Sequence, residues 1–176
     1  MADISYDELY NNMYLAKKAS SVCSIANIPI QKDKLANSND VVEIDLNQYP
    51  TARGIFEVDT QLPFGVYTLV IRAKRLNKSN SNESAFQIKI KSSEETITEI
   101  IRKKDFSDTY NTIAINFSTM NNTNKEVAIM IETHGGDTIT DDDIYSFDDF
   151  VLYPNTTSMV LQGANLNVDI IQKRAE

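Results

Sequence analysis

The sequence predicts an all-β protein: an antiparallel β-sandwich of about eight strands, preceded by an amphipathic helix. Two alternating segments frame the strand region, Phe-Gly-Val-Tyr-Thr-Leu-Val-Ile-Arg-Ala-Lys-Arg at residues 64–75 and Tyr-Ser-Phe-Asp-Asp-Phe-Val-Leu-Tyr-Pro at residues 145–154. Between them, short strand-like segments alternate with connections rich in Asn, Ser and Gly. No helix-length periodic segment interrupts the series, which favours packed antiparallel sheets over a β/α alternation.

Apolar residues at every second position identify the buried face of each predicted strand. The strands are expected over residues 41–46, 54–60, 66–75, 85–91, 96–101, 110–118, 126–133 and 146–153. The alternation is clearest in three of them, where the inward-facing sets are Tyr67, Leu69, Ile71 and Ala73; Phe86, Ile88 and Ile90; and Ile113, Ile115 and Phe117.

The N-terminal segment has several helix signals. Ser5 and Glu8 form a capping box, and Lys17 and Lys18 suit the C-terminal end of a helix over residues 6–19. Its apolar positions follow three- and four-residue spacing, namely Tyr6, Leu9, Tyr10, Met13 and Ala16. A helix this short needs a surface to pack on, which is either its own sandwich or a partner such as a second copy of the chain.

Three segments are therefore expected. Residues 1–40 form the helix and a connector, with a docking or oligomerisation role. Residues 41–155 form the β-sandwich. Residues 156–176 form a strand-like tail that either completes the edge of the sandwich or pairs with a neighbour.

Composition limits the partners. The net charge of −8 argues against nucleic-acid binding, and no apolar run is long enough to span a membrane. One cysteine, Cys23, excludes an internal disulfide. The first residues lack a basic and an apolar segment of the secretory type, so synthesis in the cytoplasm is expected.

Acidic residues crowd the region before and within the last strand, at Asp137, Asp141, Asp142, Asp143, Asp148 and Asp149. Such a cluster is either a solvated loop or a site for calcium, which takes six to eight oxygen ligands. The spacing does not match an EF-hand loop. Asp141, Asp143, Asp148 and Asp149 are the candidate ligands of a structural calcium ion.

Tyr49, Tyr110 and Tyr145 are the candidate ligand-binding residues, because they lie at predicted strand ends or in loops. There, a ring either stacks on a sugar or a partner, or lies half-buried with its hydroxyl group at the rim.

Catalytic signatures are absent from the sequence. His134 is the single histidine, no Gly-x-Ser-x-Gly motif occurs, and a single His with a single Cys argues against a zinc site. The chain is therefore expected not to be an enzyme.

The ordered set of strand motifs carries a family resemblance. The segments at residues 64–74, 86–90, 110–117, 127–131 and 147–154 together resemble the jelly-roll carbohydrate-binding modules of the galactose-binding-like superfamily, over residues 41–155. The resemblance implies a structural calcium ion near the acidic pair of the last strand, with Asp148 or Asp149 as ligand. It also implies sugar binding through aromatic rings on a concave sheet face or at loop tips.

A jelly roll with a preceding apolar helix and following strands also looks like phage head fibres, capsid decorations and tail adaptors. The function expected first is thus a non-enzymatic virion structural or assembly protein, made in the host cytoplasm, whose partners are virion proteins or further copies of itself. The alternative is a glycan-binding module that attaches to a polysaccharide or cell surface. A cytoplasmic location is the alternative to the virion.

Overall fold

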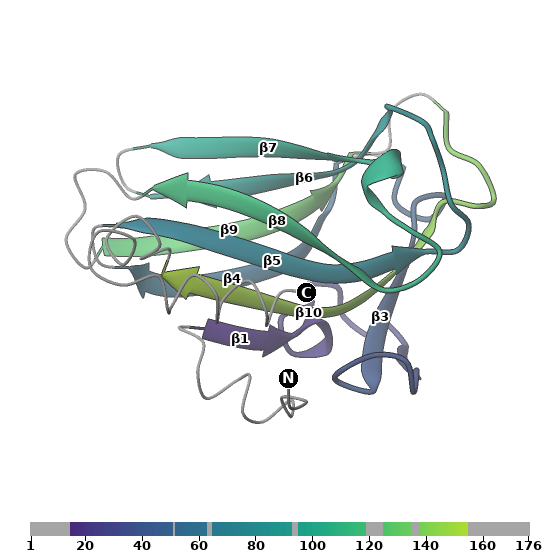
Figure 1. Ribbon diagram of the computed structural model, residues 1–176, viewed down its shortest axis with the longest axis horizontal. Coiled ribbons are helices and arrows are strands. Elements are labelled where there is room, and N and C mark those ends of the chain that lie inside the picture. The colour runs from purple at the N-terminus through teal and green to yellow at the C-terminus, as the bar shows by residue number, and fades with distance from the viewer. Residues whose placement is uncertain are drawn as a thin grey trace, which may run out of the picture.

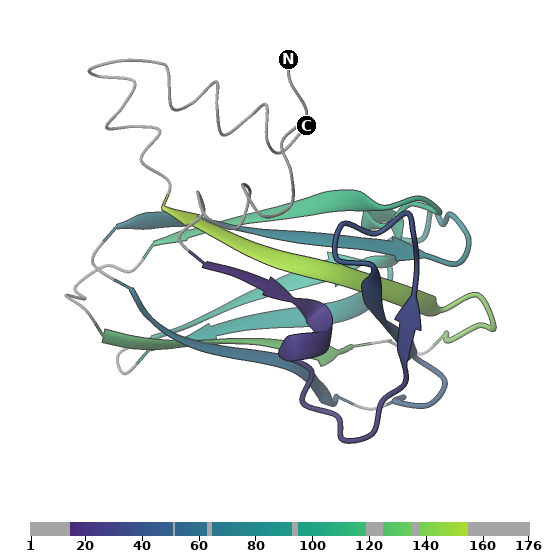
Figure 2. The ribbon, with the colours of Figure 1, turned by 90° about the horizontal axis from the view of Figure 1, so that it is seen from below.

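The protein is a jelly-roll β-sandwich of two antiparallel sheets (Figures 1 and 2). The computed structural model describes residues 15–50, 52–62, 65–92, 95–118, 125–134 and 138–154. Within these ranges almost all regular structure is strand, and the helical elements are two single 3-10 turns, η1 (Ala19–Ser21) and η2 (Lys103–Asp105).

The larger sheet has six strands in the order β2-β3-β10-β5-β8, with β1 also paired to β10. Its strands are β1 (Leu15–Lys18), β2 (Ile30–Lys32), β3 (Asp40–Asp45), β5 (Val66–Arg75), β8 (Asn111–Ser118) and β10 (Ile144–Pro154). The smaller sheet has the order β4-β9-β6-β7, formed by β4 (Gly54–Leu62), β6 (Ser84–Lys91), β7 (Thr96–Arg102) and β9 (Lys125–Thr133). Each of the eight predicted strands has its counterpart here.

The core lies between the sheets, where the inward-facing sets of both sheets meet. The alternation predicted for β5 and β6 is confirmed, because Tyr67, Leu69, Ile71 and Ala73 are buried, as are Phe86, Ile88 and Ile90. In β8, Phe117 is buried while Ile113 and Ile115 pack half-buried against the core. Tilted and edge-to-face ring contacts join Phe56, Phe86, Phe106, Tyr145 and Phe147 into the centre of this core.

Strand β10 organises the larger sheet, because it has different neighbours along its two halves. On one side it pairs with β3 over residues 144–147 and then with β1 over residues 149–152. On the other side it pairs with β5 throughout, with a bulge between Phe147 and Asp149. A bulge shifts the side-chain alternation, so Phe147 and Phe150 can both face the core with the two aspartates between them.

The structure contradicts the C-terminal end of the predicted N-terminal helix. Leu15–Lys18, assigned to the last turn of that helix, is strand β1 and pairs antiparallel with β10. Ala16 accordingly packs beside Val70, Val151 and Tyr153. The edge of β10 left uncovered by β3 provides backbone partners that override the local helix signals. The other members of the predicted docking stripe, Tyr6, Leu9, Tyr10 and Met13, lie outside the described residues, as does the tail at residues 156–176.

The connector expected over residues 20–40 is also built into the sandwich in its described part. It contributes η1 and strand β2, which pairs with β3, and it passes Cys23 beside Phe56 of the opposite sheet. The boundary expected at residue 40 therefore does not separate residues 15–40 from the jelly roll.

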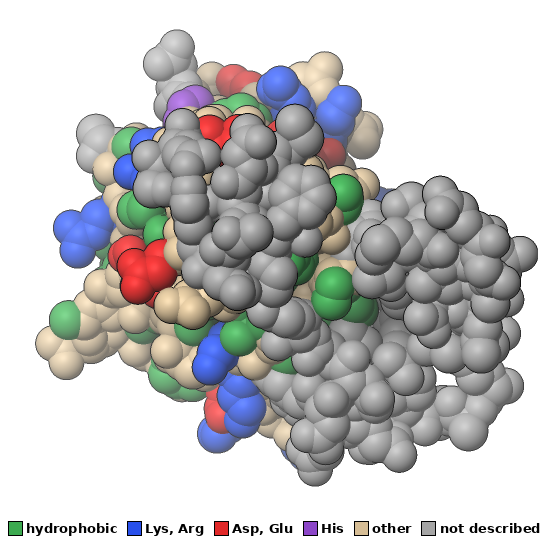
Figure 3. All heavy atoms as spheres, turned by 90° about the vertical axis from the view of Figure 1, so that its left-hand side faces the viewer, with side chains coloured by type: hydrophobic (Ala, Val, Ile, Leu, Met, Phe, Trp, Pro, Cys, Tyr) green, Lys and Arg blue, Asp and Glu red, His purple; other side chains and the backbone are tan. Residues whose placement is uncertain are grey.

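The described surface carries charges of both signs. On the face shown in Figure 3, Lys and Arg side chains lie among Asp and Glu side chains, with no continuous basic patch among the described residues. None of the helices within the described ranges has the length and hydropathy of a membrane span.

Candidate functional site

A hollow lies at the edge of the larger sheet, beside β2 and β3. Its volume is about 320 Å³. The polar and aromatic side chains that line it are Asn27, Gln31, Glu43, Asp45, Gln48 and Tyr49. Of the three tyrosines predicted from the sequence to bind ligand, Tyr49 is the one that lines this hollow.

Local sequence explains how the walls form. At the end of β3, the carboxylate of Asp45 accepts a hydrogen bond from the backbone N–H of Asn47 at 2.9 Å, and its carbonyl accepts one from Gln48 at 3.0 Å. This Asx turn reverses the chain and brings Tyr49 alongside the strand. On the facing loop, Asn27 has φ of 60°, a left-handed conformation that asparagine tolerates better than most residues.

Several polar side chains in this hollow have no partner among the described residues. Gln31, Glu43 and Gln48 are exposed, and no hydrogen bond or ion pair is formed by their side chains. Tyr49 is half-buried, packed against the core by its ring and open to the hollow. Amide and carboxylate groups without partners next to an aromatic ring are available to a bound ligand.

Of the residues that line this hollow, Tyr49 alone was predicted from the sequence. Outward-facing Glu43 and Asp45 follow from the two-residue alternation of the strand at residues 41–46, so that signal was present. Gln31 could not be found in the same way, because its segment was assigned to a connector.

A second hollow, of about 170 Å³, lies on the outer face of the same sheet. Residues of β2, β3, β5 and β10 line it, among them Gln31, Glu43, Lys74, Leu76 and Ser146. Gln31 and Glu43 thus belong to both hollows.

Tyr110 lies beside this second hollow but is already engaged. Its hydroxyl group donates to Asp33 at 2.7 Å, and Lys74 donates to the same carboxylate at 3.0 Å. The ring also lies under the cations of Lys74 and Arg72, at 4.7 and 5.5 Å from the ring centre. Burial, then the contact with Asp33, raises the pKa of Tyr110. The hydroxyl group of Tyr110 is thus hydrogen-bonded and its ring is covered by two cations. Tyr110 therefore helps to shape the hollow and does not offer a free stacking surface.

The prediction that Tyr145 binds ligand is corrected by its position. Its side chain is fully buried in the aromatic core, in edge-to-face contact with Phe86 and Phe106. Its hydroxyl group donates to Asp143 at 3.0 Å and accepts from Arg75 at 3.2 Å. Tyr145 therefore stabilises the core and cannot reach a ligand at the surface.

The candidate calcium ligands lie in two separate parts of the structure. Asp143, just before β10, is buried between Arg75 and Lys103, each 2.9 Å away, while Asp141 is exposed. Asp148 and Asp149 lie five or six residues further along, on the order of 15 Å at the rise of a β-strand. The structure does not bring the four aspartates together, which corrects the prediction of a joint site.

The acidic pair in β10 does not fit calcium either. Both oxygens of Asp148 already accept hydrogen bonds from backbone N–H groups at Asn37 and Ser38, from the Ser38 hydroxyl group and from the Arg72 guanidinium group, at 2.6–3.1 Å. Oδ2 of Asp149 is buried without a hydrogen-bond partner. Calcium needs six to eight oxygens, and no group of three acidic, His or Cys side chains forms within the described ranges. Arg72 supplies the positive charge here.

His134 takes part in no catalytic arrangement that the described residues form. Its imidazole lies 2.8 Å from the hydroxyl group of Ser84, and that hydroxyl group donates to the carbonyl of His134 itself. The ring has no contact with a carboxylate among the described side chains, so a Ser-His-Asp relay is not assembled.

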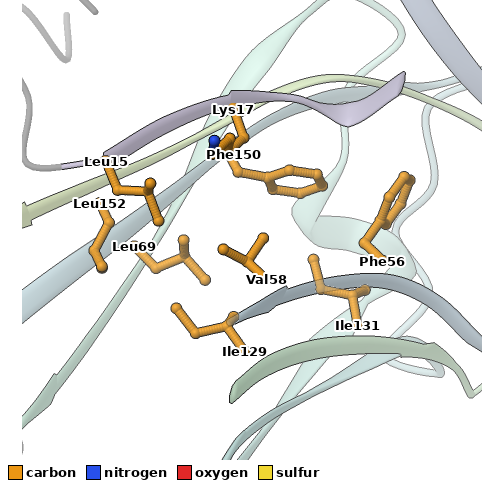
Figure 4. Close-up of a pocket in the computed structure, with 9 residues that line it drawn as sticks. All are labelled: Leu15, Lys17, Phe56, Val58, Leu69, Ile129, Ile131, Phe150 and Leu152. Atoms are coloured by element: carbon orange, nitrogen blue, oxygen red, sulfur yellow. The ribbon is translucent and has the colours of Figure 1, made fainter. Parts of the chain in front are cut away.

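Between the sheets lies a small apolar cavity of about 20 Å³ near the β1 edge (Figure 4). Val58, Leu69, Ile129 and Phe150 are among its lining residues, and Lys17 lines it from β1. Its lining is almost entirely apolar, so a cavity of this size is expected to stay dry.

Filling this cavity should stabilise the protein. Val58→Ile adds one methylene group where space exists, and we expect a gain of roughly 0.5–1 kcal/mol in the free energy of unfolding. Urea denaturation measures it. Val66→Ile is the matched control, because Val66 is 44% exposed and should change little. Destabilisation by Val58→Ile with no effect of Val66→Ile would mean that the cavity cannot take a methyl group.

Comparison with known proteins shows the fold. No family model matches the chain, and no curated protein matches it by sequence. A family 35 carbohydrate binding module from an environmental isolate superimposes with a TM-score of 0.51 at 14% identity, over 80% of this chain and 93% of that chain. A family 35 module from Clostridium thermocellum has a TM-score of 0.48 at 13% identity, over 80% and 98%.

A GH115 4-O-methyl-α-glucuronidase with specificity for decorated arabinogalactans is also similar, with a TM-score of 0.51 at 12% identity, over 86% of this chain. This chain spans only 18% of that enzyme. At such identities the likeness establishes architecture alone. The described chain therefore has the jelly-roll fold found in carbohydrate-binding modules.

Proposed function

We propose that this protein is a non-enzymatic glycan-binding module and that the glycan binds in the hollow beside Tyr49. One observation carries the proposal: a hollow of about 320 Å³ combines a tyrosine ring with amide and carboxylate groups that have no partner among the described residues. A sugar presents apolar C–H faces and several hydroxyl groups, and this lining complements both.

The roles of individual residues follow from their chemistry. Tyr49 stacks on a sugar face, because its ring is anchored against the core on one side and opens to the hollow on the other. Glu43 accepts hydrogen bonds from sugar hydroxyl groups, and the side-chain amides of Gln31 and Gln48 both donate and accept. None of these polar side chains has a hydrogen bond within the described residues that a sugar would have to displace. Binding therefore leaves no former partner of theirs unpaired.

The fold supports this function over the virion assembly role expected first from the sequence. None of the three similar structures described above is a virion component, whereas two of them are carbohydrate-binding modules of nearly the same extent. Most of the residues proposed for virion docking lie outside the described ranges, so no contact of theirs favours that role.

The experiment is a glycan array followed by calorimetry on the glycans that bind. Tyr49→Ala should lower affinity by about 1 kcal/mol, roughly fivefold, through loss of the stacked ring. Tyr49→Phe should retain that stacking, and Glu43→Gln should weaken binding. Glu99→Gln is the matched control, because Glu99 is exposed on β7 of the opposite sheet.

Because Tyr49 packs against the core, a melting curve has to show that each variant is folded. Gln48→Ala provides a second test at an exposed position of the same hollow. A blank array at millimolar glycan, or binding that Tyr49→Ala, Glu43→Gln and Gln48→Ala all leave unchanged, would exclude this site.

A further inference from the structure

We infer that the two hollows are parts of one groove, and that the ligand is an uncharged oligosaccharide chain that lies across both rather than a single terminal sugar. This inference rests on the proposed function and extends it. It concerns the length and charge of the glycan.

The two hollows are continuous because two residues line both of them. Gln31 of β2 and Glu43 of β3 line the hollow beside Tyr49 and also the hollow on the outer sheet face. A ligand leaving the first hollow therefore passes these two side chains to enter the second.

The pairing register shows how far the groove runs. Glu43 pairs with Ser146, and Ser146 pairs with Lys74 on its other side, which places these residues in one row across β3, β10 and β5. Neighbouring strands are about 4.8 Å apart, so this row alone spans roughly 10 Å. Together with the hollow beside Tyr49, the groove is longer than one pyranose ring.

The far end of the groove offers an apolar contact. Leu76 follows directly after β5, lines the hollow and is 53% exposed. Val41 is buried at the floor. These side chains suit the C–H face of a second sugar, as Tyr49 suits the first.

The charges of the groove favour a neutral chain. Lys74 is paired with Asp33, and Lys32 is paired with Asp40, so both lysines of the groove are neutralised by neighbours. Glu43 has no cationic partner among the described residues, and the chain carries a net charge of −8. A uronic acid would face the free carboxylate of Glu43 without a free cation to offset the repulsion.

The test is binding to graded series of one to six units of β-1,4-glucose, β-1,4-xylose, β-1,3-glucose and α-1,4-galacturonic acid, measured by calorimetry with the full chain. Affinity for a neutral series should rise at least fivefold from one unit to three or four and then level off. The galacturonic acid series should bind at least fivefold more weakly at equal length.

Leu76→Ser should reduce this gain with length and leave the affinity for the shortest bound sugar unchanged. Val66→Ser is the matched control, because Val66 lies at the opposite end of β5 with a similar exposure of 44%. It should change neither quantity.

The outcomes separate the two proposals. Equal affinity for one unit and six, with Tyr49→Ala still weakening both, overturns the groove and keeps the glycan site. Tighter binding of galacturonic acid overturns the neutral preference. If no series binds at any length and a broader array is also blank, both proposals fail.

Discussion

Replacing Asp143 with alanine is expected to lower the free energy of unfolding by about 3–5 kcal/mol, because it removes one member of a buried ionic cluster. Asp143 is fully buried and lies 2.9 Å from both Arg75 and Lys103, which are themselves buried. Without the carboxylate, two cations remain in the interior with incomplete compensation. Lys103 keeps Glu83, at 3.2 Å, but that carboxylate is 40% exposed and cannot replace the buried one.

Urea denaturation measures this loss, with Asp141→Ala as the matched control. Asp141 lies two residues earlier and is exposed, so its removal should stay within about 0.5 kcal/mol of wild type. Similar stabilities of the two variants would show that the cluster contributes nothing.

The same cluster sets the acid limit of stability. Burial alone would raise the pKa of Asp143, but hydrogen bonds from the Thr140 backbone, Lys103 and Arg75 lower it to about 2. A carboxyl group with a lowered pKa stabilises the fold above its unfolded value, about 4, and this contribution is lost as the pH falls toward 2.

Asp149→Asn is expected to stabilise the protein at pH 8 by roughly 2–4 kcal/mol, with little effect near pH 4. Burial first, and then the neighbouring charge of Asp148, raises the pKa of Asp149 to about 7. The folded state therefore holds a proton that the unfolded state has already released above about pH 4. Stability from this group is complete below that pH, falls as the pH rises to about 7, and stays low above it. Asparagine keeps the shape of the side chain and removes the charge.

Melting curves of wild type and Asp149→Asn from pH 4 to pH 8 test this expectation. Asp148→Asn should act in the opposite direction at neutral pH, because it weakens the ion pair with Arg72. A constant difference between wild type and Asp149→Asn across this range would show that Asp149 does not titrate there. Stabilisation of wild type by millimolar calcium at pH 8, absent from Asp149→Asn, would instead indicate a cation site, contrary to the fit of these residues.

Much of the sandwich could be predicted from periodicity. Strands with one face toward the core, such as β5 and β6, carry their orientation in every second residue, and all of their predicted inward-facing residues are buried. The same alternation is present at residues 41–46, where Glu43 and Asp45 face outward, but only Tyr49 of this hollow was predicted from the sequence as a binding residue.

The N-terminal region shows where local signals fail. The residues of β1 continue a helical apolar stripe, yet they form a strand because β10 offers an unpaired edge over residues 149–152. Strand β2 has only three residues, all exposed, so no alternation marks it. Both strands are specified by their partners in the sheet rather than by their own sequence.

The sequence by itself determined the fold class, the strands with a buried face and Tyr49 as a candidate binding residue. Tertiary structure alone decided which charges meet. Aspartates that are close along the chain were separated by the extended geometry of β10, and Asp143 and Asp148 were paired with cations 40 to 76 residues away in sequence. Tertiary structure also decided that Gln31 and Glu43 both line the two hollows. Hydrophobic periodicity specifies which face of a sheet a residue occupies, but not which polar side chains of neighbouring strands come together on that face.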